Sequence, residues 1–219
     1  MVVFNMKKKD LLNKIEDSGV VAVIRMDDTE KLQKTCESLF EGGILAIEIT
    51  LTTPDPFNVI RRLSDASNSR FIVGAGTILS QKDAQMAIEA GAQFIVSPIF
   101  NKDIIDEALK NDVVCICGGF TPTEIYSAWL AGADIVKVFP ATSAGPQYLK
   151  DIHGPLPSVK LSPTGGVDLG NVKEFIEKGA CFVGVGTALT DKKMIKENDW
   201  AGLKQHASKF IQEVKKGRA

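Results

Sequence analysis

One lysine of this sequence lies inside an apolar, strand-like segment, where its amine could act as a nucleophile. The segment is Asp134-Ile135-Val136-Lys137-Val138-Phe139-Pro140, in which β-branched and aromatic residues precede a proline. Side chains alternate along a strand, so Lys137 shares a face with Ile135 and Phe139. Burial disfavours the ammonium cation, and a neutral amine forms Schiff bases with carbonyl compounds. On this stretch alone, a lysine that extends to solvent or a buried structural ion pair is the alternative.

A glutamate in a second apolar segment is a candidate partner for proton transfer. Glu48 lies in Ala46-Ile47-Glu48-Ile49-Thr50. Buried glutamates are rare unless they are paired or functional, and Glu48 could both contact Lys137 and move protons. Arg25 follows another apolar run, residues 21–24. It could be a surface ion-pair partner or could bind a carboxylate or phosphate group.

These side chains need a scaffold that brings distant segments together, and a repeating pattern predicts one. Eight apolar runs recur at a spacing that leaves room for a helix after each strand: 20–24, 44–49, 71–73, 94–96, 113–116, 135–138, 159–161 and 182–185. Such units close most naturally into a (β/α)8 TIM barrel, an α/β fold. An open doubly wound sheet is the alternative, but no G-x-G-x-x-G motif follows the first run.

The barrel prediction sets the domain organisation and the location of the site. The whole chain, 1–219, is expected to form one domain. An additional N-terminal helix over residues 7–17 would close the barrel floor, and a final helix would start near Trp200. Thr121-Pro122-Thr123-Glu124 predicts a capped helix start, as does Ser80. Active sites of TIM barrels lie at the carboxyl ends of the strands, where Arg25, Glu48, Thr77, Pro98, Lys137, Thr164 and Thr187 would gather.

Two glycine-rich turns predict an anion site at this end of the barrel. One is Pro163-Thr164-Gly165-Gly166-Val167, and the other is Gly184-Val185-Gly186-Thr187. Glycines let the backbone approach a ligand, and free N–H groups at a helix N-terminus favour anions. Tight turns also need glycine, but the loops after strands seven and eight of barrels often bind phosphate. We therefore expect a phosphate group at these two turns.

Composition narrows the choice of partners. The net charge is −1, with 44% hydrophobic and 24% charged residues and no long block of one sign. We therefore expect neither a nucleic-acid nor a membrane partner. The absence of a long apolar run and of a signal-peptide core predicts a cytoplasmic protein. The 4 cysteines and 2 histidines show no ligand spacing, so no metal and no cofactor are expected, and Cys115 and Cys117 are interpreted as buried thiols.

Together the motifs resemble one known family, the 2-keto-3-deoxy-6-phosphogluconate aldolases, also described as 4-hydroxy-2-oxoglutarate aldolases. The resemblance covers nearly the whole chain, and further motifs that carry it are Gly74-Ala75-Gly76-Thr77, Phe94-Ile95-Val96-Ser97-Pro98 and Lys137-Val138-Phe139-Pro140. It implies a class I aldolase on a (β/α)8 barrel, commonly a homotrimer, without a metal. By this resemblance Lys137 forms the Schiff base and Glu48 is the acid/base. Its implied substrate-binding residues are Arg25, Thr77, Pro98, Phe139, Thr164, Gly165, Gly166, Gly186 and Thr187.

The resemblance implies a substrate and leaves some choices open. The substrate would be 2-keto-3-deoxy-6-phosphogluconate, cleaved to pyruvate and glyceraldehyde 3-phosphate, with 4-hydroxy-2-oxoglutarate as a second one. Some members carry an arginine for the substrate carboxylate where this chain has Thr52, so Arg25 is expected to serve instead, while Thr77 meets the pyruvate carboxylate. The alternatives are an aldolase for the galactonate epimer, a phosphosugar isomerase or epimerase on the same barrel, and an inactive barrel that only binds such a sugar acid.

Overall fold

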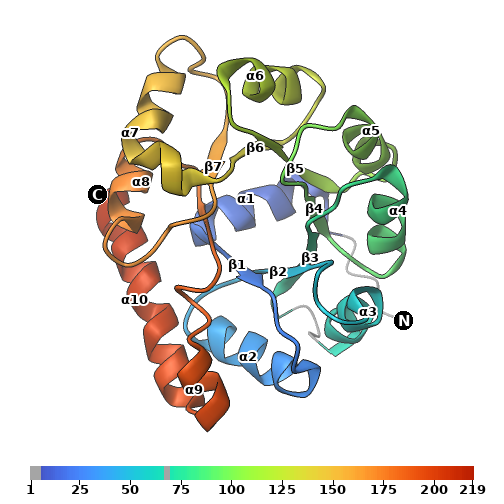
Figure 1. Ribbon diagram of the computed structural model, residues 1–219, viewed down its shortest axis with the longest axis vertical. Helices are drawn as coiled ribbons and strands as arrows, with labels where there is room; N and C mark the ends of the chain where they lie inside the picture. Colours follow the sequence, from blue (N-terminus) through green and yellow to red (C-terminus); the bar gives the residue numbers. More distant parts are fainter. Residues whose placement is uncertain (1–5, 67–69) are drawn as a thin grey trace.

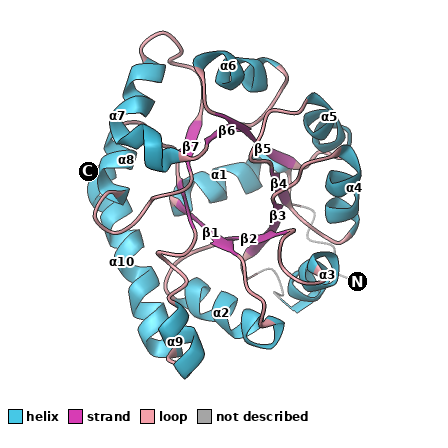
Figure 2. Cartoon of the chain, viewed as in Figure 1, coloured by secondary structure: helices cyan, strands magenta, loops and turns pink. Residues whose placement is uncertain are grey.

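Parallel strands form a barrel in the computed structural model, which describes residues 6–66 and 70–219. All neighbouring strands are parallel, in the order β7-β6-β5-β4-β3-β2-β1-β8 (Figure 2). The eight described strands are β1 (Val20–Ile24), β2 (Ala46–Thr50), β3 (Ile72–Gly76), β4 (Phe94–Val96), β5 (Val114–Gly119), β6 (Ile135–Val138), β7 (Leu161–Pro163) and β8 (Val183–Val185). The predicted TIM-barrel architecture is therefore confirmed.

The barrel closes between β7 and β8 by isolated bridges, in contrast to the paired ladders elsewhere. Leu161 bridges to Ala180, and Thr164 bridges to Gly184. The N–H of Cys181 also donates to the carbonyl of Leu161 at 3.0 Å. This junction, which we call the β7–β8 seam, lies beside the two glycine-rich turns.

Helices surround the strands on the outside of the barrel (Figure 1). Those that follow β1 to β7 are α2 (Thr29–Glu41), α3 (Pro56–Ala66), α4 (Gln81–Glu89), α5 (Lys102–Lys110), α6 (Pro122–Leu130), α7 (Ala141–His153) and α8 (Val172–Glu177), and β8 is followed by α9 (Lys192–Glu197) and α10 (Trp200–Arg218). The predicted caps are present: Ser80 accepts a hydrogen bond from the Asp83 N–H, and Thr121 and Glu124 form a capping box. Each such cap contributes about 1 kcal/mol to helix stability.

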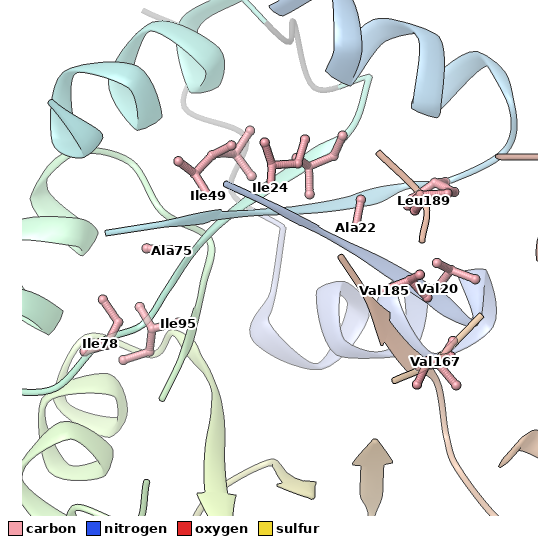
Figure 3. Packing of buried hydrophobic residues seen from close by; sticks show 14 of the residues in the cluster. Val20, Ala22, Ile24, Ile49, Ala75, Ile78, Ile95, Val167, Val185 and Leu189 are labelled. Atoms are coloured by element: carbon pink, nitrogen blue, oxygen red, sulfur yellow. The ribbon is translucent and has the colours of Figure 1, made fainter. Parts of the chain in front are cut away.

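Two layers of apolar side chains hold the barrel together. The outer layer lies between strands and helices and includes Ile24, Ile49 and Ile95 (Figure 3). Each of these side chains is fully buried, which stabilises the fold by roughly 1.5–3 kcal/mol per residue. The strands are therefore nearly continuous apolar runs, because both of their faces are covered.

The inner layer fills the lower half of the barrel and fixes the position of the site above it. Helix α1 (Lys8–Ser18) inserts Leu11 and Ile15 among inward side chains such as Phe94 and Ile135. Figure 1 shows α1 behind the ring of strands, as expected for a floor helix. With the amino-terminal end filled, polar inward side chains are left for the opposite end, where Glu48 and Lys137 lie.

Two kinds of feature are absent from the described residues, a membrane-spanning helix and a metal-binding cluster. Within residues 6–66 and 70–219, no helix combines the length and the apolar character needed to cross a membrane. The same residues contain no cluster of three or more His, Cys, Asp or Glu side chains that could bind a metal ion. Cys115 and Cys117 are buried free thiols, and burial raises the pKa of each.

Candidate active site

Lys137 is an almost fully buried lysine that points into the barrel. Its relative exposure is 5%, and it alternates with Ile135, which belongs to the inner apolar layer. Its Nζ lies 5.1 Å from the ring centroid of Phe139, within the range of a cation–π contact. In the described part of the chain, no carboxylate lies within ion-pair distance of this Nζ. The amine therefore neither extends to solvent nor is held in a structural ion pair.

Glu48 faces the same lumen from β2 and is 3% exposed. Burial raises the pKa of its carboxyl group, while the positive charges of Lys137 and Arg25 act in the opposite direction. A carboxyl group whose pKa is raised above its ordinary value keeps its proton more readily and is better suited to act as an acid as well as a base. Glu48 thus has the environment of a general acid/base, and it interacts electrostatically with Lys137.

Glycines make room for Glu48 and for the chain that follows β4. A Cβ built on Gly76 would come within 1.8 Å of Glu48 Oε1. On the other side of the lumen, Gly118 pairs with Lys137 in the β5–β6 ladder. A Cβ on Gly118 would come within 2.2 Å of the backbone carbon of Pro98. The chain after β4 therefore packs closely against the strand next to Lys137, which places Pro98 at the site.

Thr77 has an unusual backbone at the end of β3. Its φ is 61°, in the left-handed region that β-branched residues avoid. Strained backbone of this kind persists where the surrounding structure enforces it and clusters at functional sites. Its neighbour Gly76 pairs with Thr50 across the β2–β3 ladder, and the Thr50 and Thr52 hydroxyls lie 2.9 Å apart. Hydroxyl groups therefore occupy the strand ends beside Glu48.

A cavity of about 420 Å³ lies at the β7–β8 seam and contains the two predicted glycine-rich turns. Nothing among the described residues accepts a hydrogen bond from the backbone N–H groups of Gly165, Gly166, Thr187 or Ala188. Gly165 and Gly166 have φ values of 92° and 73°, which favour glycine. Successive free N–H groups of this kind form an anion-binding concavity. The lining residues are Val23, Arg25, Thr164, Gly165, Gly166, Val167, Asp168, Gly186, Thr187, Ala188 and Thr190.

The structure divides the predicted residues into two neighbouring groups. Arg25, Thr164, Gly165, Gly166, Gly186 and Thr187 line the cavity, while the other five predicted residues lie at the ends of β2 to β6. Phe139 connects the groups, because a Cβ on Gly165 would lie 3.6 Å from its ring. A larger hollow of about 660 Å³ between α2 and α3 contains none of the predicted residues. The predicted residues therefore gather at the smaller cavity and at the barrel mouth next to it.

Sequence reasoning missed several residues of the site. Val23, Asp168, Ala188 and Thr190 line the cavity, but their types carry no signal of their own. Gly76 stands in one motif of the resemblance, but its contact with Glu48 depends on strand register. The spacing of glycines on one face of β3, at positions 74 and 76, was the one available signal of close approach.

A buried lysine and a buried glutamate in one lumen, with an anion cavity beside them, define a class: barrel enzymes that act through an imine. Comparison with known proteins makes this specific. The chain matches the family described as KDPG and KHG aldolase over residues 11–206. These abbreviations stand for the two keto acids named above.

Individual relatives agree with this match. The chain is 33% identical to the 2-dehydro-3-deoxy-phosphogluconate aldolase of Pseudomonas aeruginosa over 190 residues, 86% of each chain. It is 30% identical over 171 residues to the 2-dehydro-3-deoxy-6-phosphogalactonate aldolase of Escherichia coli, covering 78% of this chain and 83% of that one. A structure of KDPG aldolase from Legionella pneumophila, with pyruvate captured as a covalent carbinolamine intermediate, superposes with a TM-score of 0.84 at 28% identity, covering 94% and 98%. The chain therefore belongs to the KDPG and KHG aldolase family and is a Schiff-base-forming aldolase, a carbon–carbon lyase.

Proposed function

We propose that this enzyme cleaves 2-keto-3-deoxy-6-phosphogluconate to pyruvate and glyceraldehyde 3-phosphate. The observation that carries the proposal is the position of the anion cavity beside the lumen that holds Lys137 and Glu48. A substrate with a keto acid at one end and a phosphate at the other matches this arrangement. Unphosphorylated 4-hydroxy-2-oxoglutarate, cleaved to pyruvate and glyoxylate, is a second substrate that would leave the cavity unused.

In the proposed reaction the neutral amine of Lys137 attacks the 2-keto carbon. Glu48 supplies and removes protons as the carbinolamine forms and loses water. The resulting iminium accepts electrons when the C4 hydroxyl is deprotonated and the C3–C4 bond breaks, which releases glyceraldehyde 3-phosphate. The enamine is then protonated, and hydrolysis of the imine frees pyruvate and the lysine.

The phosphate is assigned to the N–H groups around Gly165, Gly166 and Thr187, with the Thr187 hydroxyl adding one contact. Thr77, Pro98 and Phe139 would surround the pyruvyl part. Arg25 lines the cavity together with these loops. This position gives Arg25 a second candidate role, contact with the phosphate, beside the carboxylate contact expected because Thr52 replaces an arginine.

The galactonate epimer of the sugar acid is an alternative substrate. Two relatives support it, since aldolases named for the phosphogalactonate compound reach 32% and 30% identity with this chain. The two epimers differ only in the configuration of one hydroxyl group. Measuring kcat/KM for both compounds decides between them, because the preferred substrate will have the higher value.

The test of the reaction class is covalent trapping. Pyruvate with borohydride should add one reduced pyruvyl group to the intact mass, and peptide mapping should place it on Lys137, because only an imine is trapped in this way. Lys137→Arg should abolish both labelling and cleavage, since a guanidinium does not attack carbonyls. Lys102→Arg, an exposed control lysine at 64%, should change neither. Label on another lysine would show that the imine forms elsewhere than on Lys137. No label at all would favour an isomerase or a binding protein.

Self-association and location complete the proposal. One structural relative, 27% identical, is a cage designed by fusing symmetric oligomeric domains. We expect this chain to be a homo-oligomer, specifically a homotrimer, and to be cytoplasmic. Light scattering should give a mass near three chains of 23.7 kDa. A mass of one chain would contradict the oligomer, and a mass of two chains would contradict the trimer.

A further inference from the structure

The side chains of Asn171 and His206 form hydrogen bonds to the backbone of the two cavity loops from outside the cavity, and neither residue has been given a role so far. We propose that Asn171 and His206 are positioning residues that direct the loop N–H groups into the cavity and thereby set the affinity for the phosphate group. This inference rests on the proposed function of the same cavity. Neither residue lines the cavity, so each must act through a backbone carbonyl that it binds.

Asn171 holds the loop after β7 at two points. Its Nδ2 donates to the carbonyl of Gly166 at 2.8 Å, and its Oδ1 accepts from the N–H of Asp168 at 3.0 Å. In a trans peptide unit the C=O and the following N–H point in opposite directions. With the Gly166 carbonyl turned towards Asn171, the N–H of Val167 points the other way, and Val167 lines the cavity.

His206 holds the loop after β8 from helix α10. Its Nε2 donates to the carbonyl of Ala188 at 2.7 Å. The imidazole packs edge-on against Phe210, with ring centroids 5.4 Å apart, and Phe210 is fully buried. Inside the loop, the N–H groups of Leu189 and Thr190 donate to the carbonyl of Gly186, which leaves those of Thr187 and Ala188 open. A rigid helix thus fixes the turn that carries Thr187.

The physical effect of the two tethers is preorganisation. Glycine-rich turns can rotate their peptide units, and a carbonyl oxygen that turned inward would repel a phosphate. A hydrogen bond that holds the carbonyl outward removes this alternative before the ligand arrives, so less ordering is needed on binding. The tethers should therefore affect phosphate affinity but not imine formation at Lys137, which is not among the residues that line the cavity.

The experiment compares the full-length wild type with His206→Leu, His206→Gln and Asn171→Leu. His206→Leu removes the donor and His206→Gln keeps an N–H donor, while Asn171→Leu removes both hydrogen bonds of the amide without adding a charge near the cavity. The matched control is His153→Leu, because the other histidine donates in the same way to the carbonyl of Val159 at 3.0 Å, away from the cavity. The probes are inorganic phosphate as a competitive inhibitor and borohydride-trapped imine formation with pyruvate.

We expect the inhibition constant for phosphate to rise roughly tenfold in His206→Leu and Asn171→Leu, as for one lost hydrogen bond. It should stay near the wild-type value in His206→Gln and His153→Leu, with pyruvate trapping retained throughout. If Asn171→Leu and His206→Leu both fold and both leave the inhibition constant unchanged, the inference is overturned. An equal rise in His153→Leu overturns it as well. If phosphate fails to inhibit the wild type while pyruvate is trapped, the proposed phosphate cavity itself is wrong, which is a separate failure.

Discussion

Gly76 lies directly against the carboxylate of Glu48, so close that a methyl group at position 76 would come within 1.8 Å of Oε1. The φ of Gly76 is not in the left-handed region, so its backbone would accept any residue. The glycine is needed for space alone. The two residues belong to neighbouring strands, and their contact sets where the proposed acid/base can be.

Gly76→Ala should therefore displace the Glu48 carboxylate and lower kcat. We expect a loss of at least about 10²-fold, the lower end of what general acid/base help contributes. The control is Gly74→Ala on the same face of β3, where a Cβ would instead come within 2.4 Å of the Phe94 ring. That variant should lose stability by about 1–3 kcal/mol through overpacking, with kcat of the folded fraction less affected. Equal kcat losses in both variants would show that barrel distortion, not the carboxylate, is responsible.

Glu48→Gln keeps the shape of the side chain and removes its titration. Steady-state kinetics should show kcat reduced by ~10²–10⁴-fold with little change in KM. The reason is that proton transfer contributes to the transition state, whereas the amide still fills the same space. A near-normal kcat would mean that water or another group moves the protons.

The same substitution should stabilise the protein at neutral pH. An unfolded glutamate ionises near 4.5, but burial raises the pKa of Glu48 in the folded state. The unfolded state thus releases its proton first, so the free energy of unfolding falls as pH rises from 4.5 towards the folded pKa. Glu48→Gln has no titrating group at this position, so its free energy of unfolding does not fall in this way. Urea unfolding should show the difference in stability between the variant and the wild type growing across that pH range, in favour of the variant.

Glu107 provides a control of opposite sign for this pH dependence. It is also buried, but the hydrogen bond from Gln81 at 2.9 Å lowers its pKa. Its stabilising contribution is present above the ordinary pKa and is lost as pH falls through the folded value. The free energy of unfolding of Glu107→Gln should therefore drop further below that of the wild type as pH rises through this range. A Glu48→Gln advantage that stays constant with pH would contradict the raised pKa.

Thr187→Val and Arg25→Ala should separate the two ends of the substrate. Thr187→Val should raise KM for the phosphorylated sugar acid and leave pyruvate trapping intact, because pyruvate has no phosphate. Arg25→Ala should lower kcat/KM by more than roughly tenfold, the effect of a lost charge-assisted hydrogen bond. If trapping by pyruvate is also impaired, Arg25 binds the carboxylate. If only the phosphorylated substrate suffers, it binds the phosphate. No effect on either would make Arg25 a surface residue.

Much of the fold followed from local signals. Apolar runs and helix caps are short-range features, so the alternation of strands and helices, the floor helix α1 and the capping box at Thr121 were all predictable. The strand bounds were less predictable. The apolar run 159–161 predicts a strand that the structure places at Leu161–Pro163 (β7), because pairing with β6, not apolarity, decides where a strand starts. Lys137 and Glu48 stood out for a physical reason, since a charge in an apolar run requires an explanation.

The rest of the site depends on contacts that sequence does not display. His206 reaches Ala188 from α10, which begins at Trp200 beyond helix α9, and histidine on a helix has no distinctive pattern. The left-handed backbone of Thr77 is likewise imposed by its surroundings, because the residue itself disfavours it. The place of Arg25 beside the glycine-rich loops required the closed barrel, which brings β1 next to β8.

The β7–β8 seam has a thermodynamic consequence. Its isolated bridges give this junction fewer backbone hydrogen bonds than a ladder would. Local opening of the barrel is therefore expected there first. A phosphate bound by N–H groups of the loops after β7 and after β8 would link the two sides of the seam. Because it binds only the closed form, it would suppress such openings by mass action. Amide hydrogen exchange in β7 and β8 should then slow on addition of phosphate, while exchange in β3 and β4, on the far wall of the barrel, should not.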